Sequence, residues 1–482
     1  MAKVSAAPAR SVAVVGAGWA GCAAAVELAR TGCHVTLFEA ARVAGGRARR
    51  VSIGEHTVDN GQHIMLGAYR ETLRLMARVG IDAGQALLKL PLQMRYPPGS
   101  GGMDFIAPRL PAPLHLLGAL LRATGLERED KMSLARFSTT ARWMGWQLHT
   151  DCSVSELLVR FDQTPRLIQL MWRPLCLAAL NTPPERASAQ VFLNVLRDSL
   201  GAKRAASDML IPRADLSALL PDAALEYVAA HGGSIQLGTK VNAIAPDGDG
   251  WLLNVGHDAG APAGNAVSAQ PGDATTVGTS SEPVLPAEVP QPRRFDAVVL
   301  ATPAAATARL LAAFPATADL RATLDVFTPE AITTCYLQYD PSVRLDLPFY
   351  ALLDNPAHAN WGQFVFDRGQ LDPAQAGLLA VVISASGAAA ELGQEALAQA
   401  IAAQLAAVLQ RPALGKQHWH KVITEKRATF ACAPAIVRPS NKTGLKRLSI
   451  AGDYTASDYP ATLEAAVRSG IQAAKTLWED TD

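Results

Sequence analysis

Apolar positions near the start of the chain form two short runs with an alanine-rich stretch between them. Residues 12–15 and 34–38 are mostly apolar and rich in β-branched side chains, which predicts buried strands of a parallel sheet. Residues 20–30 are rich in alanine and are followed by Thr31 and Gly32, which predicts a helix that ends at a glycine. The chain therefore opens with a predicted strand–helix–strand unit.

Similar patterns predict further elements downstream. Apolar residues with helical spacing are found at 69–79 and 191–200, and Pro221 favours a helix start at Asp222. Residues 389–409 predict one long helix rich in alanine, glutamine and leucine. Strands are predicted at 234–237, 239–245, 251–255, 295–302, 332–339, 364–366 and 378–384.

Residues 256–294 interrupt this pattern. The segment is rich in Ala, Gly, Pro, Ser and Thr and has almost no large aliphatic side chains, a composition typical of a disordered surface loop. Because a buried strand is predicted directly after it, the loop is expected to join two strands of one domain. Its deletion is expected to leave folding and cofactor binding nearly unchanged.

Three glycines after the first strand form the first candidate site. Gly16, Gly18 and Gly21 have the G-x-G-x-x-G spacing, which provides a tight turn, a close approach of the backbone to a pyrophosphate, and close packing of helix on strand. Glu39 ends the second strand, where an acid accepts hydrogen bonds from ribose hydroxyls and disfavours the 2′-phosphate of NADP. A glycine-rich turn without a ligand is the alternative, and the ordered strand, helix and glutamate disfavour it.

A second element, Gly45-Gly46-Arg47, follows Glu39 closely. A glycine pair with an arginine can bring backbone and a fixed cation against phosphates. Together with the preceding motif, it resembles the FAD-dependent amine oxidase and carotenoid desaturase superfamily, and the resemblance implies FAD as the cofactor. The sequence has no second G-x-G-x-x-G, so a built-in NAD(P)H domain is not expected.

Segments nearer the C-terminus extend the same resemblance. Val241 matches the position whose backbone passes the adenine, and residues 296–302 match the strand near the pyrophosphate. Gly452 and Asp453 match the pair that contacts ribityl or phosphate oxygens, ahead of a predicted helix at 463–474. Asp453 could also cap that helix, and one carboxylate can do both.

The resemblance implies an α/β fold, with a Rossmann-like FAD-binding domain of the amine oxidase and phytoene desaturase type and an inserted α+β substrate or cap domain. We expect the FAD-binding domain to be discontinuous. Its expected segments are 1–100, 205–310 and 445–482, and those of the substrate domain are 101–204 and 311–444.

A narrower resemblance rests on Asp59-Asn60-Gly61-Gln62-His63 and on residues 172–200 and 211–228. These segments resemble the squalene-associated desaturase-like flavoproteins, the hydroxysqualene dehydroxylases of hopanoid biosynthesis. The resemblance spans nearly the whole chain outside 256–294. It implies that reduced FAD delivers hydride to an allylic carbon of hydroxysqualene while the hydroxyl leaves as water, and that Gly61 and Gln62 lie at the cofactor.

Such a reaction needs a proton donor for the departing oxygen and a dry apolar pocket. His63 would lie near the isoalloxazine, and its ordinary pKa of about 6.5 suits a proton donor. The alternative is that His63 and Gln62 only hydrogen-bond the flavin or the backbone. Tyr454 and Asp458 are further candidates near the flavin.

Other functions stay open at this point. A carotenoid-type desaturase would use the same scaffold and a similar apolar substrate, but would run oxidatively. An amine oxidase would bind an amine and would commonly carry a lysine near the flavin. A non-catalytic scaffold would leave its cofactor without an evident use. The sequence indicates no particular electron donor for the FAD.

Composition excludes some partners. The chain has 482 residues with a net charge of +1, so electrostatics give no support for nucleic-acid binding. The six cysteines show no C-x-x-C spacing and favour reduced thiols over disulfides or a zinc site. His418 and His420 have no acidic or thiol partner nearby in the sequence, so no metal site is predicted.

The expected location is the cytoplasm, with contact to the inner face of the cytoplasmic membrane. No run of 18 or more uncharged apolar residues exists, so no spanning helix is expected, and the apolar N-terminal run is interpreted as strand and helix rather than as a signal peptide. Residues 114–121 predict either a short interfacial helix or a buried helix of the cap domain. A long apolar isoprenoid substrate would favour the interfacial helix.

Overall fold

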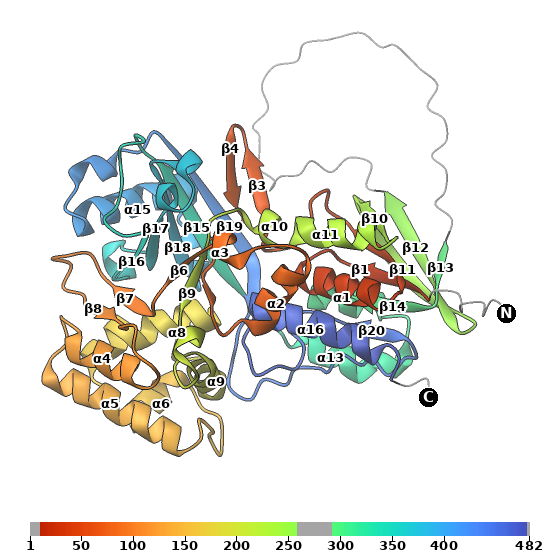
Figure 1. Ribbon diagram of the computed structural model, residues 1–482, viewed down its shortest axis with the longest axis horizontal. Helices are drawn as coiled ribbons and strands as arrows, with labels where there is room; N and C mark the ends of the chain where they lie inside the picture. Colours follow the sequence, from red (N-terminus) through yellow and green to blue (C-terminus); the bar gives the residue numbers. More distant parts are fainter. Residues whose placement is uncertain (1–9, 258–291, 480–482) are drawn as a thin grey trace, which may run out of the picture.

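A five-stranded parallel sheet organises one half of the protein. The computed structural model describes residues 10–257 and 292–479. The strand order is β10-β2-β1-β14-β20, so strands from the start, middle and end of the chain lie side by side (Figure 1). Their bounds are β1 (Ser11–Val15), β2 (His34–Glu39), β10 (Ser234–Leu237), β14 (Ala297–Leu300) and β20 (Leu448–Ile450). The predicted α/β fold is confirmed.

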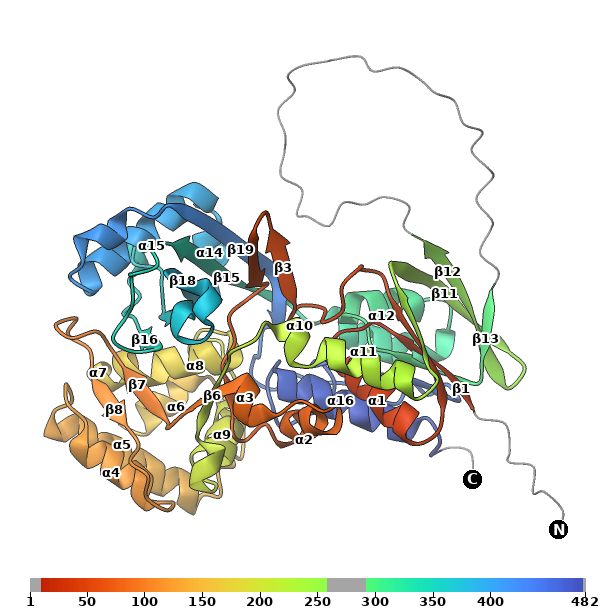
Figure 2. The ribbon, with the colours of Figure 1, turned by 45° about the horizontal axis from the view of Figure 1, so that its top comes forward.

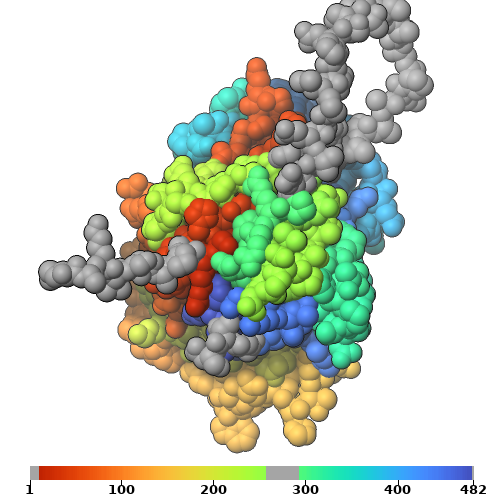
Figure 3. Space-filling view, turned by 90° about the vertical axis from the view of Figure 1, so that its right-hand side faces the viewer, coloured from red at the N-terminus to blue at the C-terminus, as the bar shows by residue number. Residues whose placement is uncertain are grey.

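Alternate side chains of β1 pack against different layers. Val12 and Val14 face helices α1 (Trp19–Arg30), α11 (Pro221–Ala230) and α16 (Leu463–Thr476), whereas Ala13 and Val15 face an antiparallel sheet. That sheet consists of β11 (Thr239–Asp247), β12 (Gly250–His257) and β13 (Arg293–Phe295). Figure 3 views this end of the molecule, where segments coloured red, green and blue meet at the surface. The central strands are therefore buried on both faces, as their continuous apolar runs require.

The other half is built on an antiparallel sheet with the strand order β16-β17-β18-β15-β19. The strands span Phe349–Ala351, Phe364–Asp367, Leu378–Ser384, Pro329–Gln338 and Trp419–Phe430, in that order. Helix α15 (Gln394–Val408) packs on one face against side chains such as Val365. Phe364 and Phe366 point to the opposite face, because successive strand residues alternate.

A helical layer and a small hairpin complete this half (Figure 2). Trp172 is its largest fully buried side chain, and its ring lies 4.6 Å from that of Phe137 and 6.1 Å from that of Phe192. Its elements are β7 (Gln93–Arg95), β8 (Asp104–Ile106), α4 (Leu114–Arg122), α5 (Arg128–Trp143), α6 (Val154–Arg160), α7 (Pro165–Leu167), a π-helix (Ile168–Trp172), α8 (Arg173–Leu180) and α9 (Ala189–Ser199). Across residues 10–257 and 292–479, none of the helices combines the length and apolar character needed to cross a bilayer.

Two sequence predictions are wrong in detail. The single helix expected at 389–409 is two helices, α14 (Gly387–Ala390) and α15, because Gly393 between them adopts a φ of +82°. The single strand expected at 295–302 is the end of β13 and then β14, with Asp296 between them. The Asp296 carboxylate accepts hydrogen bonds from the backbone N–H and hydroxyl of Ser11, which fixes the chain between the two sheets.

Both ends of the segment predicted as a disordered loop, 256–294, belong to strands. Strand β12 continues to His257, and β13 begins at Arg293 and pairs antiparallel with β12. Residues 258–291 lie outside the described residues. The assignment of 1–100, 205–310 and 445–482 to one FAD-binding domain stays a prediction. Strand β7, near the end of the first segment, pairs with β8 and contacts β16 of the other half, which bears on the limit at residue 100.

Candidate active site

The turn from β1 into α1 forms a cradle with room for a ligand. Gly16 adopts a φ of +105°, and a Cβ on Gly21 would lie 1.8 Å from the carbonyl oxygen of Gly16, so the fold itself requires both glycines. Gly18 differs, because a Cβ there would meet no protein atom closer than the Cα of Gly46, at 4.0 Å. The space over Gly18 at the start of α1 therefore suits a pyrophosphate, which the amides and dipole of the helix would favour.

Glu39 lies at the carboxyl end of β2, beside this cradle. Its Oε2 accepts the N–H of Ala17 at 2.7 Å and its Oε1 accepts the N–H of Ala41 at 2.8 Å. These two bonds hold the carboxylate against the cavity wall, which it helps to line. A fixed carboxylate in this place can accept hydrogen bonds from ribose hydroxyls.

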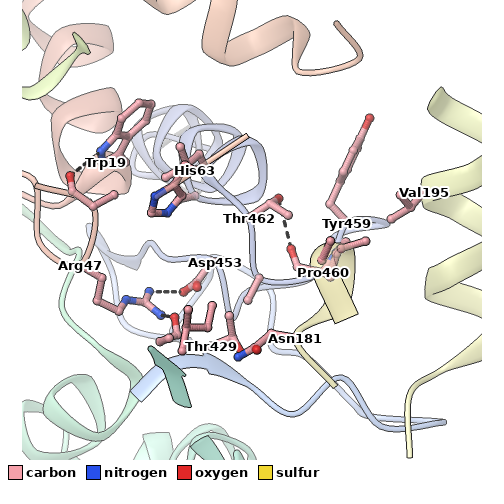
Figure 4. A pocket seen from close by; sticks show the side chains of 18 of the residues that line it. Trp19, Arg47, His63, Asn181, Val195, Thr429, Asp453, Tyr459, Pro460 and Thr462 are labelled. Atoms are coloured by element: carbon pink, nitrogen blue, oxygen red, sulfur yellow. Dashed lines mark hydrogen bonds and ion pairs between the residues drawn. The ribbon is translucent and has the colours of Figure 1, made fainter. Parts of the chain in front are cut away.

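An ion pair joins the two ends of the chain at the same cavity. Arg47 follows Gly45 and Gly46, which both adopt positive φ, and its guanidinium lies 2.7 Å from the Asp453 carboxylate. The other terminal nitrogen of Arg47 donates to the carbonyl of Ala428 at 2.7 Å. Figure 4 shows Arg47 and Asp453 together with His63 at one common space. A phosphate or ribityl group placed there would meet a cation that is already oriented.

Residues 60–63 follow β4 (His56–Asp59) and line the cavity. His63 Nδ1 lies 2.7 Å from the carbonyl oxygen of Gly61, which can only accept, so Nδ1 carries the hydrogen. Burial is the main cause that lowers the pKa of His63, and the nearby Arg47 lowers it further. A lowered pKa favours the neutral imidazole, in which Nε2 carries no hydrogen and can accept a hydrogen bond.

Gln62 is held by its neighbours. Its Oε1 accepts a hydrogen bond from Arg368 at 2.9 Å, and its Nε2 donates to the carbonyl of His63 at 3.3 Å. A Cβ on Gly61 would make ordinary van der Waals contact with His63 and Thr334, each at 3.8 Å. Gly61 and Gln62 both line the cavity, as expected for residues at a cofactor, and their roles in cofactor binding stay predictions.

Most of the remaining predicted residues line the same cavity. Val241 is buried in β11 and lines the cavity, and Gly452 donates its N–H to Ser469 at 2.9 Å. Tyr454 also lines the cavity, and its hydroxyl is hydrogen-bonded to the Thr307 hydroxyl and to the carbonyl of Thr302. Asp458 does not line the cavity, and its exposed carboxylate pairs with Arg197 at 3.2 Å.

One continuous cavity of about 1410 Å³ connects this cradle with the other half of the protein. That volume exceeds the 300–1,000 Å³ of a typical small-molecule pocket, roughly enough for a dinucleotide and a second ligand together. Away from the cradle its walls are mainly aliphatic and aromatic. These walls include Leu92, Met94, Phe105, Leu116, Leu120, Leu134, Phe137, Met171, Trp172, Leu175, Phe364, Phe366 and Val382.

Sequence reasoning missed several polar residues of the cavity. Asn181 ends α8 in the left-handed conformation and donates to the Thr429 hydroxyl at 2.9 Å. Glu425 of β19 accepts from Asn60 at 3.3 Å, close to the Arg47–Asp453 pair. An asparagine before Thr-Pro-Pro signals the end of a helix, so Asn181 could have been predicted as a helix cap. No spacing in the sequence, however, indicates that it lines the cavity. In the described part of the chain, no cluster of three or more metal-ligating side chains is present.

The fold and cradle together define a dinucleotide-binding oxidoreductase of the flavoprotein class. A family model described as flavin containing amine oxidoreductase matches residues 19–477, and the chain belongs to this family. It is therefore an FAD-dependent oxidoreductase. The glycine cradle and the ribose-side glutamate fit the dinucleotide form of the flavin, and no observation of the site argues against it.

Two individual proteins and one solved structure are similar to the chain over nearly its whole length. The chain is 29% identical to a hydroxysqualene dehydroxylase of Rhodopseudomonas palustris, over 96% of this chain and 97% of the relative. It is 25% identical to a zeta-carotene desaturase of Synechocystis sp., over 97% of this chain and 96% of the relative. A solved oxidoreductase from Methanosarcina mazei superposes with a TM-score of 0.69 at 15% identity, covering 97% of this chain and 100% of that chain, which shows the fold alone.

Proposed function

We propose that the protein reductively removes the hydroxyl group of hydroxysqualene to give squalene, a step of hopanoid and isoprenoid synthesis. The observation that carries this proposal is the continuous cavity, which joins a dinucleotide cradle to a long apolar chamber. The relatives named hydroxysqualene dehydroxylase, similar over nearly the whole chain, support the same substrate.

In this proposal the apolar walls hold a long isoprenoid chain and exclude water. Phe137, Trp172 and Phe366 give the chamber rigid aromatic sides, so a developing allylic cation would be shielded from capture by water. Reduced FAD, when bound, supplies the hydride. The side chains of Asn181 and Thr429 are polar and hydrogen-bond each other. They lie next to Ala428, whose carbonyl accepts a hydrogen bond from Arg47. In this proposal they orient the substrate hydroxyl.

The reaction also needs partners and a compartment. An external electron donor would reduce the FAD, because the chain has no second dinucleotide motif. All six cysteines are free thiols, which suits a reducing compartment, so the cytoplasm is the proposed location.

An oxidative desaturase is the second candidate, because the similarity to the Synechocystis zeta-carotene desaturase covers 97% of the chain, and that to the Rhodopseudomonas palustris dehydroxylase covers 96%. The same apolar walls would accept a carotenoid-like polyene. Amine oxidation has less support: among the described residues that line the cavity, the one lysine is Lys240, on β11 of the cofactor half. Among the described residues, no lysine lines the apolar part of the cavity in the other half of the protein.

Anaerobic incubation of the dithionite-reduced flavoprotein with detergent-dispersed hydroxysqualene tests the proposal. We expect squalene, identified by mass spectrometry of organic extracts, in stoichiometric amounts with reoxidised flavin. Reduced flavin that persists without squalene formation, in protein that stays folded, would refute the proposal. The oxidised flavoprotein with phytoene-like polyenes would then test the desaturase alternative.

A further inference from the structure

Helix α4 presents an apolar stripe to solvent. Leu114 and Leu117 each keep 51% of their surface exposed and Leu121 keeps 70%, and their spacing places all three on one face of the helix. The opposite face buries His115 and Ala119. A surface helix of a globular protein normally turns its apolar stripe toward the core, and α4 turns one of its two apolar faces outward.

Helix α5 lies beside α4 and adds two exposed apolar side chains (Figure 2). Met132 and Trp143 stand three helical turns apart and so share a face, and Trp143 keeps 88% of its surface exposed. Contiguous exposed apolar residues of this kind mark a site of interaction. We call the outward-facing residues of segment 108–143 the α4–α5 surface.

The cavity opens through this surface. Pro113 and Leu117 of the α4 segment line the cavity and are exposed, and so are Ala135, Thr139 and Arg142 of α5. Residues that both line the cavity and reach solvent mark its openings: those of α4 and α5 mark a mouth on this surface, and residues such as Lys240 and Arg427 mark others elsewhere. The exposed leucines therefore border an opening into the apolar chamber.

The charge of the α4–α5 surface differs from that of the whole chain. Residues 108–143 carry six Lys or Arg and three Asp or Glu, a net charge of +3, whereas the entire protein carries +1. Asp130 is buried, so its charge does not face solvent, while five arginines of the segment are exposed. These are Arg109, Arg122, Arg128, Arg136 and Arg142.

We propose that the α4–α5 surface docks on a bilayer that contains anionic lipids, with the stripe of α4 in the acyl–headgroup boundary. Exposed leucines beside arginines match the two components of such binding, apolar burial and attraction to anionic headgroups. A second copy of this chain fits less well, because a symmetric contact would set the same cationic surface against itself. The cavity mouth would then face the lipid, and delivery of a lipid-dissolved substrate through it rests on the proposed function.

The test uses the purified holoenzyme and two kinds of vesicle. One contains phosphatidylglycerol and phosphatidylcholine in equal parts, and the other contains phosphatidylcholine alone. The variant Leu114→Glu/Leu121→Glu changes two stripe residues that do not line the cavity. The matched control, Leu392→Glu/Val437→Glu, adds the same two charges at exposed apolar positions outside the segment. Flavin content and thermal unfolding show that each variant is folded.

We expect wild type and control to co-sediment with the anionic vesicles. The partition coefficient of the stripe variant should be lower by about tenfold or more. Wild type that binds neither vesicle would overturn the proposal, as would equal binding by the stripe variant and the control. Sedimentation velocity without lipid gives the oligomeric state; a dimer that the stripe variant abolishes would assign the surface to a second copy instead. Since vesicle binding requires no turnover, its failure is distinguishable from failure of the proposed function.

Discussion

Arg47 and Asp453 stand 406 positions apart in the chain, and their side chains meet at 2.7 Å. The pair connects the loop after β2 with the loop after β20, that is, a segment near the start of the chain with one near its end. Both residues line the cavity where a pyrophosphate is expected. Closure of the cofactor site therefore depends on contact between the first and the last segments of the chain.

A double-mutant cycle tests whether this contact acts in cofactor binding. We expect Arg47→Ala and Asp453→Ala each to weaken FAD binding, with a coupling free energy of about 1 kcal/mol, because each residue orients the other. The measurement is the FAD dissociation constant of the four proteins from flavin fluorescence. Additive losses would mean that the two side chains act independently on the cofactor.

Gly18 offers a clean test of the pyrophosphate cradle. Because a Cβ at this position would meet no protein atom closer than the Cα of Gly46, at 4.0 Å, Gly18→Ala should change the free energy of unfolding of the apoprotein by less than about 1 kcal/mol. The methyl group would instead occupy the space of the phosphates, and FAD affinity should fall by about tenfold or more. Gly21→Ala is the contrasting variant, since its Cβ would collide with Gly16 and destabilise the fold itself. Unchanged FAD affinity in folded Gly18→Ala would contradict the cradle.

Glu39 is expected to bind ribose hydroxyls. Glu39→Ala should cost about 1.5–3 kcal/mol of FAD binding free energy, since it removes charged hydrogen bonds. Glu39→Gln keeps one acceptor oxygen and should lose less. Equilibrium dialysis of the apoproteins against FAD compares the two variants, and full retention of FAD by Glu39→Ala would speak against the ribose assignment.

These sites could be predicted to different degrees from the sequence. Gly16, Gly18, Gly21 and Glu39 lie in a single contiguous strand–helix–strand unit, so local spacing alone locates them. Arg438 shows the opposite case. It donates to the carbonyls of residues 453, 457 and 459 and thereby shapes the loop after β20, but nothing near it in the sequence signals this contact.

Helix α4 shows a second limit of sequence reasoning. Its apolar pattern predicted a helix correctly, but left open whether that helix is buried or lies at an interface. The answer depends on which elements pack beside it, and these come from distant parts of the chain. The break before α15, by contrast, had a sequence signal, because Gly393 lies inside the window predicted as one helix and glycine readily adopts the positive φ found there.

His63 remains the predicted catalytic residue, and its geometry sharpens the test. His63→Ala should lower turnover by about 10²-fold or more while the flavin stays bound, if the imidazole acts on the reacting groups. If protonated His63 is the proton donor, the rate should fall as the pH rises through the pKa of His63, which lies below 6.5. A pH profile of single-turnover rates with hydroxysqualene separates the roles. Unchanged turnover in His63→Ala would remove the residue from the mechanism.

Asp59 predicts how stability depends on pH. Its side chain is 4% exposed and accepts the N–H of Leu216 at 2.8 Å, and burial raises its pKa from 3.8 to about 7. Asp215 raises this pKa further, whereas Arg368 and Arg50 lower it. Between about pH 4 and pH 7 the folded protein therefore holds a proton that the unfolded chain has released.

The free energy of unfolding should consequently fall across that range, and the loss should be complete above about pH 7. Asp59→Asn keeps an acceptor for Leu216 and cannot ionise, so it should match wild type near pH 4 and be more stable at pH 8, by on the order of 2 kcal/mol. Urea unfolding of both proteins at several pH values measures the difference, in which the titration of all other groups cancels. Parallel stability curves for the two proteins would show that Asp59 is ionised in the fold, with its charge compensated by Arg368 and Arg50.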